Sequence, residues 1–314
     1  LSTAVFATVK YVFRAPELDT DKPVVTPDGT ASTDVDRTGT DEPDALGRTR
    51  RKYCYNILVS GLDDDNGGSD TNILVRFDVP NKRIDLVSLP RDTLLHNEYR
   101  NNKLNFAYAK GGTELLMEQI ENLLGIPVDF YVTVNLKGFI ALVDQIDGVD
   151  FDIPINMDYD DPYQDLHIHF TKGPRHLNGQ EAMEVVRFRH NNDGTGYGTE
   201  DIGRIGTQQA FLKAVAKQLL QIGNVKNIPA LVDIFYTYVK TDLTTGNLVW
   251  LGNEALNIGT ENIHFATLPG DGSGYYNKQS VYVLDAQATC DLVNEALNPY
   301  NEALTLEDMD ILVP

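Results

Sequence analysis

Cysteine is scarce in this sequence of 314 residues, which contains only Cys54 and Cys290. Two cysteines so far apart form neither a zinc-binding constellation nor a CxxC redox motif. In an oxidising extracellular setting the two thiols could pair as a disulfide, and the alternative is that each thiol is buried on its own. The sequence excludes a cysteine-based metal or redox centre and leaves both arrangements of the thiols open.

Positively charged residues are also scarce. The sequence has 26 lysines and arginines but 46 aspartates and glutamates, so its formal net charge is −20. An excess of negative charge opposes nonspecific binding to DNA or RNA, so no nucleic-acid partner is expected. The same charge repels a phosphate ligand at long range. A local basic pocket can still bind phosphate, since salt screens charges over about 8 Å.

The apolar N-terminal segment, residues 1–13, is too short to cross a bilayer, which takes about 20 residues. It is either the outer end of a membrane anchor that precedes residue 1 or an amphipathic helix that packs on the domain. Residues 16–52 are rich in Asp, Thr, Pro and Gly without sustained periodicity. We therefore expect residues 1–52 to form a membrane-proximal segment with a polar linker, and residues 53–314 to form one globular domain.

Alternating strand and helix signals predict an α/β fold for residues 53–314, with a central mixed sheet flanked by helices. Strands are predicted at residues 56–60, 72–77, 83–89, 130–135, 149–153 and 262–268, the second and third joined as a hairpin. Helices are predicted at residues 113–124, 136–146 and 285–297, the first ended by Gly125.

The densest convergence of fixed charge lies in residues 177–215. Asn178, followed three residues later by Glu181, predicts a helix N-terminus with a reciprocal capping box. The end of this helix presents Arg187 and Arg189. An extended or irregular backbone is favoured there, and it would turn both arginines to the same side, whereas a continuing helix would make them diverge by roughly 200°.

A second helix is predicted after residues 191–198, whose Asn, Asp and Gly content is typical of a mobile loop. Spacings of three and four residues place Asp201, Arg204 and Gln208 on one face of this helix. The neighbouring apolar stripe is predicted to comprise Ile205, Leu212, Val215 and Leu219.

Three arginines around one glycine-containing loop suggest a phosphate site. The guanidinium group is planar and permanently charged, and it donates two parallel hydrogen bonds to two oxygens. For any one arginine, a surface pair with an aspartate is the simpler interpretation, and such pairs have little energetic consequence. The three together favour a phosphate ligand.

Two loops that leave predicted strand ends carry Asp63, Asp70, Arg91 and Asp92. Ligands are expected at strand ends in α/β sheets. Carboxylates collected there suit Mg²⁺, which commonly takes one or two of them together with phosphate oxygens and water. The alternative is that Asp63 belongs to a solvated acidic turn and that Asp70 caps a strand.

A second acidic stretch, residues 156–165, is predicted to be a solvated surface insertion, because its carboxylates lack a recognisable ligand pattern. His167 and His169 alternate along a possible strand that follows. Two histidines alone are a weak zinc signal, so these two are predicted to be exposed residues of an edge strand.

Several pieces of the sequence, in order from Asn56 to Gln209, resemble the LytR-CpsA-Psr domain of Gram-positive bacterial cell envelopes. These pieces are NILVSGLD, SDTNILVRFD, VSLPRDT, KLNFAYAKGG, LNGQEAMEVVRFRH and DIGRIGTQQ. The most specific part is the RxRH element followed by DxGR and then Gln. The match covers about half of the chain.

This resemblance implies a membrane-anchored phosphotransferase on the outer face of the cell membrane. Members of the family move a glycopolymer, such as teichoic acid or capsule, from an undecaprenyl-pyrophosphate carrier onto peptidoglycan. By the same resemblance, Asp63 and Asp70 match the aspartates that bind Mg²⁺, or Mn²⁺ in its place, and Asp201 matches a further motif aspartate. The residues that match those around the pyrophosphate are Arg91, Arg187, Arg189, Arg204 and Gln208.

The sequence departs from the family pattern at three places. Gly68 and Ser69 stand where family sequences often carry an arginine, and Thr207 stands where the arginine before the final glutamine is usual. The loop of residues 191–200 is longer than the family pattern. These departures bear on which substrate is bound and how strongly its pyrophosphate is held.

Two other functions use the same residues. One is a hydrolase that gives the same lipid-linked intermediate to water, and the other is a noncatalytic protein that binds prenyl-linked wall polymer. The complete set of aspartates and arginines argues against the noncatalytic protein. For a transferase, Asp92 is a weak candidate for the general base because it adjoins Arg91.

Overall fold

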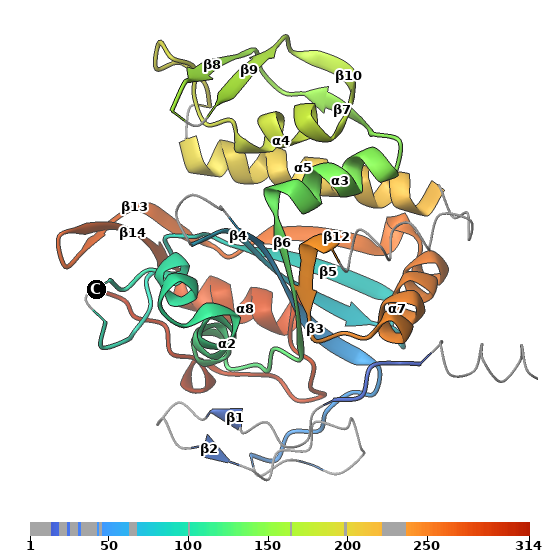
Figure 1. Cartoon of the computed structure of the whole chain (residues 1–314). Coiled ribbons are helices and arrows are strands. Elements are labelled where there is room, and N and C mark those ends of the chain that lie inside the picture. The colour runs from blue at the N-terminus through green and yellow to red at the C-terminus, as the bar shows by residue number, and fades with distance from the viewer. Residues whose placement is uncertain are drawn as a thin grey trace, which may run out of the picture. The chain divides into compact units, whose positions relative to one another are not determined.

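The computed structural model describes residues 14–18, 24–25, 31–32, 43, 46–62, 68–99, 101–163, 165–197, 200–221 and 237–314. The chain divides into two compact units (Figure 1). Unit 1 comprises Leu1–Thr133 and Lys240–Pro314, and unit 2 comprises Val134–Val239. No helix among the described residues is long and apolar enough to cross a membrane.

Unit 1 is built on a six-stranded sheet with the strand order β11-β6-β3-β4-β5-β12. Strands β3, β4 and β5 are consecutive antiparallel neighbours, and β12 runs parallel to β5, so the sheet is mixed as predicted. The bounds are β3 Cys54–Leu62, β4 Ser69–Asp78, β5 Arg83–Leu89, β6 Phe130–Asn135, β11 Val239–Thr241 and β12 Ile263–Thr267.

Helices cover both faces of this sheet (Figure 1). On one face, α2 (Leu104–Leu124) and α8 (Ala286–Ala296) pack over Leu58, Leu74 and Val87 in one core cluster. On the other face, α7 (Thr245–Ile258) contributes to a second cluster with Tyr55 and Phe77. Successive strand residues point to opposite faces, so the near-continuous apolar run of β3 supplies both clusters.

Helix α2 is longer than the sequence indicated. It was predicted to begin at Thr113, but it begins at Leu104 and passes through a kink at Gly111 and Gly112. Gly112 has φ +69°, a conformation that glycine adopts without the cost that a Cβ atom brings. The predicted C-terminus is confirmed, because Gly125 is left-handed with φ +66° and its N–H bonds to the carbonyl of Glu121.

Unit 1 also contains smaller elements outside its six-stranded sheet. These are β1 Val24–Val25, β2 Ala31–Ser32, β13 Gly270–Tyr276, β14 Gln279–Leu284 and the 3₁₀ turns η2 Thr260–Asn262 and η3 Leu306–Asp308. Strands β13 and β14 form an antiparallel ribbon. The backbone of Tyr282 in β14 exchanges hydrogen bonds with Asp92 (2.8 Å) and Leu94 (2.9 Å), so this ribbon holds the segment that follows β5.

A buried ion pair fixes residues just before β3 to the sheet. Arg50 pairs with Asp129, and the two side chains are only 1% and 2% exposed. The Asp129 carboxylate also accepts the backbone N–H of Asn56 at 2.7 Å, and Arg50 donates to the carbonyl of Cys54 at 2.9 Å. Such a pair orders residues 50–56 because neither charge has water as an alternative partner.

The two cysteines are free thiols, each buried in unit 1. Cys290 belongs to the cluster under α8, and Cys54 begins β3. Burial raises the pKa of the Cys54 thiol to about 11. The structure therefore selects separate buried thiols over a disulfide.

The part of unit 2 that the structure describes includes helices α3, α4 and α5 and two antiparallel ribbons around a core of its own. The helices are α3 Leu136–Gln145, α4 Gly179–Arg187 and α5 Glu200–Gln221. The ribbons pair β7 Val149–Ile153 with β10 Gly173–Leu177, and β8 Met157–Asp161 with β9 Leu166–Phe170. Phe188 and Phe211, at 1% and 0% exposure, are the largest fully buried side chains of this core.

Candidate functional site

An ion pair at the end of two sheet strands forms the first part of the candidate site in unit 1. Asp70 lies in β4 and Arg91 lies two residues beyond the end of β5, and an Arg91 Nη1–H donates to Asp70 Oδ1. The side chains are 35% and 28% exposed. The structure thus brings together two residues that the sequence only placed at strand ends, and solvent reaches both.

Asp92 and Lys103 form the second part. Lys103 Nζ lies 3.3 Å from Asp92 Oδ1, and Arg91 Nε lies 3.6 Å from the same oxygen. Lys103 was not predicted as a site residue, although it begins the KLNFAYAKGG motif. The structure shows why Lys103 belongs to this group: its ammonium group approaches the same Asp92 carboxylate as Arg91 does.

Backbone hydrogen bonds hold these side chains in place. Asn105 N–H donates to the carbonyl of Arg91 (2.9 Å), and Leu104 N–H donates to the carbonyl of Thr93 (3.0 Å). Thr93 is fully buried, and its hydroxyl donates to the carbonyl of Pro90 at 2.6 Å. The segment after β5 is therefore bonded to the start of α2, so Arg91 and Asp92 emerge from a fixed backbone.

In unit 2 the predicted capping box is present. The Asn178 side chain accepts the N–H of Glu181 (2.9 Å), and the Glu181 carboxylate accepts the N–H of Asn178 (3.1 Å). Helix α4 ends at Arg187, and Phe188 has extended angles of φ −59° and ψ 134°. The extended interpretation of this junction is confirmed.

The two arginines at this junction have different surroundings. Between them, Phe188 is anchored in the core of unit 2. Arg187 is half-buried, whereas Arg189 is exposed. Among the described residues, no side chain forms a hydrogen bond or ion pair with the Arg189 guanidinium, so its donors are available to an anionic ligand.

The loop after Arg189 is held by hydrogen bonds over its described part, residues 190–197. His190 and Gly196 form an antiparallel bridge, and Asn191 N–H donates to the carbonyl of Thr195 at 2.7 Å. Asn192 N–H donates to the carbonyl of Asp158 in β8 at 3.2 Å. The described part of the loop forms a turn that is attached to a strand, and its mobility stays a prediction.

Helix α5 buries a stripe that shares Val215 with the one predicted and otherwise differs from it. Among its described side chains, the buried ones are Arg204, Thr207, Phe211 and Val215. Ile205 and Leu212 are only half-buried, and the Leu219 side chain lies outside the described part. Arg204 therefore belongs to the buried face, at 6% exposure, and not to an adjoining polar face.

Two contacts connect α5 to the segment before it. Gln208 donates from Nε2 to the carbonyl of Val186 at 3.1 Å, which fixes the last turn of α4. The Tyr197 hydroxyl lies 2.7 Å from that of Thr207, and a Cβ atom on Gly203 would come within 2.3 Å of the Tyr197 side chain. Thr207, which stands where the family resemblance led us to expect an arginine, contacts the Tyr197 hydroxyl instead.

The predicted site residues thus form two groups. Asp70, Arg91 and Asp92 are grouped in unit 1 together with Lys103, which was not predicted, and Arg187, Arg189, Arg204 and Gln208 belong to unit 2. Asp63 lies outside the described residues, as does the Asp201 side chain. The roles of all these residues remain predictions.

A divalent cation fits the part of its expected site that the structure describes. Asp70 is a partly exposed carboxylate with one oxygen bonded to Arg91, and its second oxygen has no hydrogen-bond partner among the described residues. Mg²⁺ needs only one or two protein carboxylates when phosphate oxygens and water complete its shell. Asp70 is thus suited to supply one ligand.

Comparison with known proteins identifies the family. A model described as the LytR_cpsA_psr family matches residues 25–298. The chain belongs to this family. The family resemblance inferred from the sequence motifs is therefore confirmed over most of the chain.

Two relatives within the LytR_cpsA_psr family are named as enzymes. The polyisoprenyl-teichoic acid–peptidoglycan teichoic acid transferase TagV of Bacillus subtilis is 32% identical over 252 residues, 76% of this chain and 62% of TagV. TagU of Bacillus cereus, named as the same kind of transferase, is 31% identical over 267 residues, 83% of each chain. This chain spans less than two thirds of the length of TagV.

The fold is also that of a solved family member. The crystal structure of Bacillus subtilis TagV superimposes with a TM-score of 0.67 at 28% identity, covering 84% of this chain and 100% of that one. The α/β architecture with a central mixed sheet is therefore the LytR_cpsA_psr fold.

Proposed function

We propose that this protein transfers a glycopolymer phosphate unit, of the teichoic acid or capsular type, from an undecaprenyl-pyrophosphate carrier to a peptidoglycan hydroxyl. Family membership and the names of TagV and TagU support transfer of a wall polymer. The proposed place of action is the outer face of the cell membrane, with an anchor preceding residue 1. The carrier, the anchor and the assistance of Mg²⁺ are the parts of the proposal that go beyond those names.

The observation that carries the proposal is the Arg91 group in unit 1. Arg91 and Lys103 both reach Asp92, and Arg91 also reaches Asp70, so two cations and two carboxylates meet at one strand end. Cations suit phosphate oxygens and carboxylates suit a divalent metal. About a third of the Asp70 and Arg91 side chains is exposed, so a ligand can reach these groups and replace their ion pairs.

In the proposed reaction a sugar hydroxyl of peptidoglycan attacks the phosphorus nearer the glycan. A new phosphorus–oxygen bond forms on that side, and the bond to the bridging oxygen breaks on the other. Undecaprenyl phosphate leaves with the bonding electrons, and the hydroxyl proton passes to a base or to solvent. Phosphoryl transfer of this kind is catalysed mainly by positioning and by stabilisation of charge on the oxygens.

The arginines are proposed to supply that stabilisation. In unit 1, Arg91 is proposed to donate to phosphate oxygens. The family resemblance assigns the same kind of role to Arg187, Arg189 and Arg204 of unit 2, where Gln208 keeps the end of α4 in position. When bound, Mg²⁺ would neutralise negative charge on the pyrophosphate. Asp70 would hold it together with Asp63.

An acceptor-dependence assay tests the proposal. The protein is incubated with a lipid-pyrophosphate-linked sugar, with and without peptidoglycan fragments. We expect a sugar-phosphate-acceptor diester with the fragments and little free sugar phosphate without them. Rapid release of sugar phosphate without an acceptor would identify a hydrolase, and no product in either arm would identify a noncatalytic binder.

A further inference from the structure

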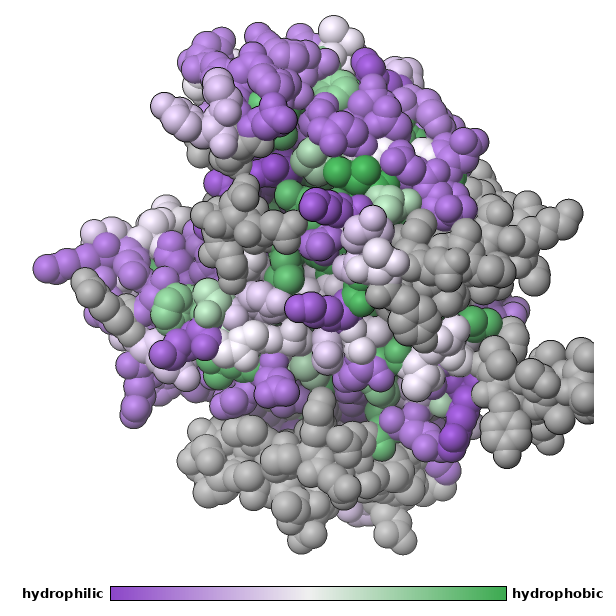
Figure 2. All heavy atoms as spheres, in the orientation of Figure 1, coloured by the Kyte–Doolittle hydropathy of each residue, from purple (hydrophilic) through white to green (hydrophobic). Residues whose placement is uncertain are grey.

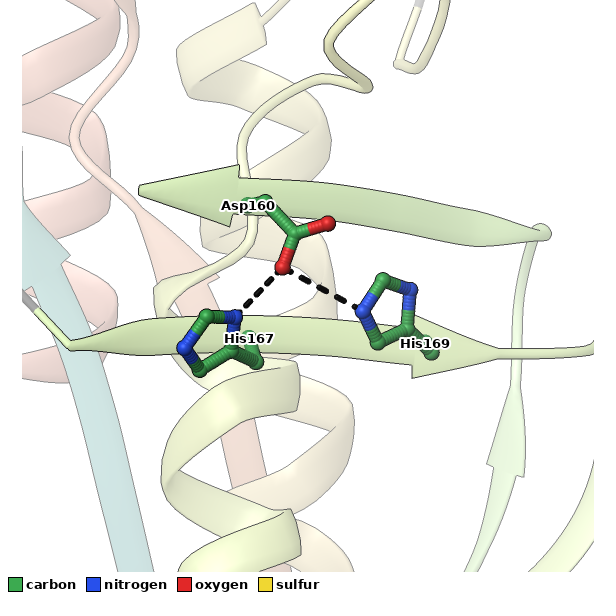
Figure 3. A group of neighbouring side chains, drawn as sticks. All are labelled: Asp160, His167 and His169. Carbon is green, nitrogen blue, oxygen red and sulfur yellow. Dashed lines mark hydrogen bonds and ion pairs between the residues drawn. The ribbon is translucent and has the colours of Figure 1, made fainter. Parts of the chain in front are cut away.

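The exposed face of the β8–β9 ribbon in unit 2 carries a cluster of two histidines and one aspartate. Asp160 lies in β8, and His167 and His169 lie two residues apart in β9, so both rings point to the solvent side (Figure 3). The strand register places Asp160 opposite His167. One ligand atom from each of the three residues lies within 4.8 Å of the others.

The separations are within reach of metal coordination. A tetrahedral ion with ligand distances of about 2.1 Å places its donor atoms about 3.4 Å apart. Asp160 Oδ1 is already 3.4 Å from His169 Nε2, and it contacts His167 Nδ1 directly. The side chains are about half exposed, so small rotations can complete the geometry without disturbing the core.

An outer carboxylate orients the His169 imidazole, and a second carboxylate lies near the outer side of the His167 imidazole. Asp158 Oδ1 lies 2.8 Å from His169 Nδ1, the nitrogen that faces away from Asp160. Asp165 Oδ1 lies 3.6 Å from His167 Nε2, the outward nitrogen of that ring, which is an ion-pair distance and too long for a hydrogen bond. A carboxylate that accepts the outer N–H of an imidazole fixes the tautomer whose inner nitrogen has a free lone pair, and this is the usual support for metal-bound histidine.

We propose that Asp160, His167 and His169 bind one divalent transition-metal ion of the Zn²⁺ class. Two imidazoles and one carboxylate suit Zn²⁺, Cu²⁺ or Ni²⁺, whereas Mg²⁺ and Ca²⁺ prefer oxygen-only shells. Three protein ligands leave one position for water. Hydrophilic residues cover the surface over β8 and β9 (Figure 2), and neighbouring acidic groups favour a cation there.

The competing account is that these are ordinary exposed ion pairs, which contribute little to stability because water screens them. Unit 2 contains such a pair for comparison: His176 Nδ1 lies 2.7 Å from Asp150 Oδ1, with both side chains exposed. Among the described residues, that pair does not belong to a three-ligand group, and the β8–β9 cluster does. The second imidazole and the outer carboxylates distinguish the proposed site.

A bound ion would also affect the loop that follows Arg189. Asn191 Oδ1 accepts the N–H of Asp158 at 2.7 Å, and Asn192 Oδ1 accepts the N–H of Asp160 at 2.6 Å. The loop is therefore attached to the strand that contributes the aspartate ligand. An ion that joins β8 to β9 would restrict the loop, and any effect on catalysis rests on the function proposed above.

Metal binding is tested on the whole chain after treatment with a chelator. Zn²⁺ is titrated in competition with a chromophoric indicator, in the presence of excess Mg²⁺. We expect one ion per chain, with affinity lowered more than about 100-fold in His167→Ala and His169→Ala and about 10- to 100-fold in Asp158→Asn. The matched control His176→Ala should bind as the wild type does.

Folding and loop restriction are measured on the same proteins. Because both histidines are exposed, their alanine variants should melt at the wild-type temperature without metal, and only proteins with the site should gain stability from Zn²⁺. Amide exchange of residues 191–197 should slow on Zn²⁺ binding in the wild type and not in His169→Ala. The proposed site would be overturned if the wild type bound Zn²⁺ no more tightly than His167→Ala does. It would also be overturned if His176→Ala lost as much Zn²⁺ affinity as His167→Ala. Both outcomes are independent of the transfer assay.

Discussion

Arg189→Lys separates the geometry of the arginines from their charge. Arg189 is exposed, and no described side chain pairs with it, so the substitution should change the free energy of unfolding by no more than about 0.5 kcal/mol. Lysine keeps the charge but cannot form two parallel bonds to a phosphate. Loss of one charge-assisted hydrogen bond is worth about 1.5–3 kcal/mol, which is about 10- to 150-fold in kcat/KM.

The assay measures initial rates of diester formation alongside thermal melting. Arg175→Lys is the matched control, because Arg175 is also an exposed arginine of unit 2 but is paired with Glu181 at 2.7 Å. That variant should keep wild-type activity. Wild-type kcat/KM in Arg189→Lys would refute the reasoning, since the arginine would then act by net charge or not at all.

Three further predictions follow from buried or metal-binding groups. Asp70→Asn should raise the Mg²⁺ concentration needed for half-maximal turnover without lowering the melting temperature; unchanged Mg²⁺ dependence, with and without chelator, would exclude Asp70 as a ligand. Asp129→Asn leaves Arg50 buried without its carboxylate and should reduce the denaturant-derived stability by about 3–5 kcal/mol, whereas Glu295→Gln, at the exposed Arg83 pair, should change it by less than about 1 kcal/mol. Cys54, whose pKa burial raises to about 11, should resist thiol reagents at pH 8 until the protein is unfolded, and labelling of the native protein would contradict its burial.

Elements whose ends are set by nearby residues could be predicted from the sequence. Strand β5 has the predicted bounds, because a turn and a proline delimit it. The capping box of α4 and the left-handed Gly125 after α2 were also predicted. Each of these signals is decided within about four residues of the chain, so no knowledge of the tertiary structure was needed.

Features that depend on distant partners could not be predicted in this way. Helix α2 continues through Gly111 and Gly112 because residues before the kink, such as Leu104, pack into the core. Arg204 is buried because the face of α5 that carries it is turned toward the core of unit 2. Periodicity alone did not distinguish this face from the neighbouring apolar stripe. Tertiary packing overrides local propensity at such positions.

The candidate site shows the same division. Arg91 and Asp70 were predicted as site residues from strand ends and family motifs, but the approach of Lys103 to Asp92 depends on how α2 meets the segment after β5. The histidine cluster depends on the register of β8 against β9, which no local signal in β9 specifies. Its two histidines were correctly predicted to be exposed, and their common carboxylate was not foreseen.

The most direct test of phosphoryl transfer follows the phosphorus atom nearer the glycan. A lipid-linked substrate labelled at that phosphorus is incubated with the protein and peptidoglycan fragments, and the products are separated. The account predicts that the label enters the diester between glycan and peptidoglycan, while the lipid is recovered as unlabelled monophosphate. Label recovered with the lipid, or a glycan joined to peptidoglycan without phosphorus, would contradict it.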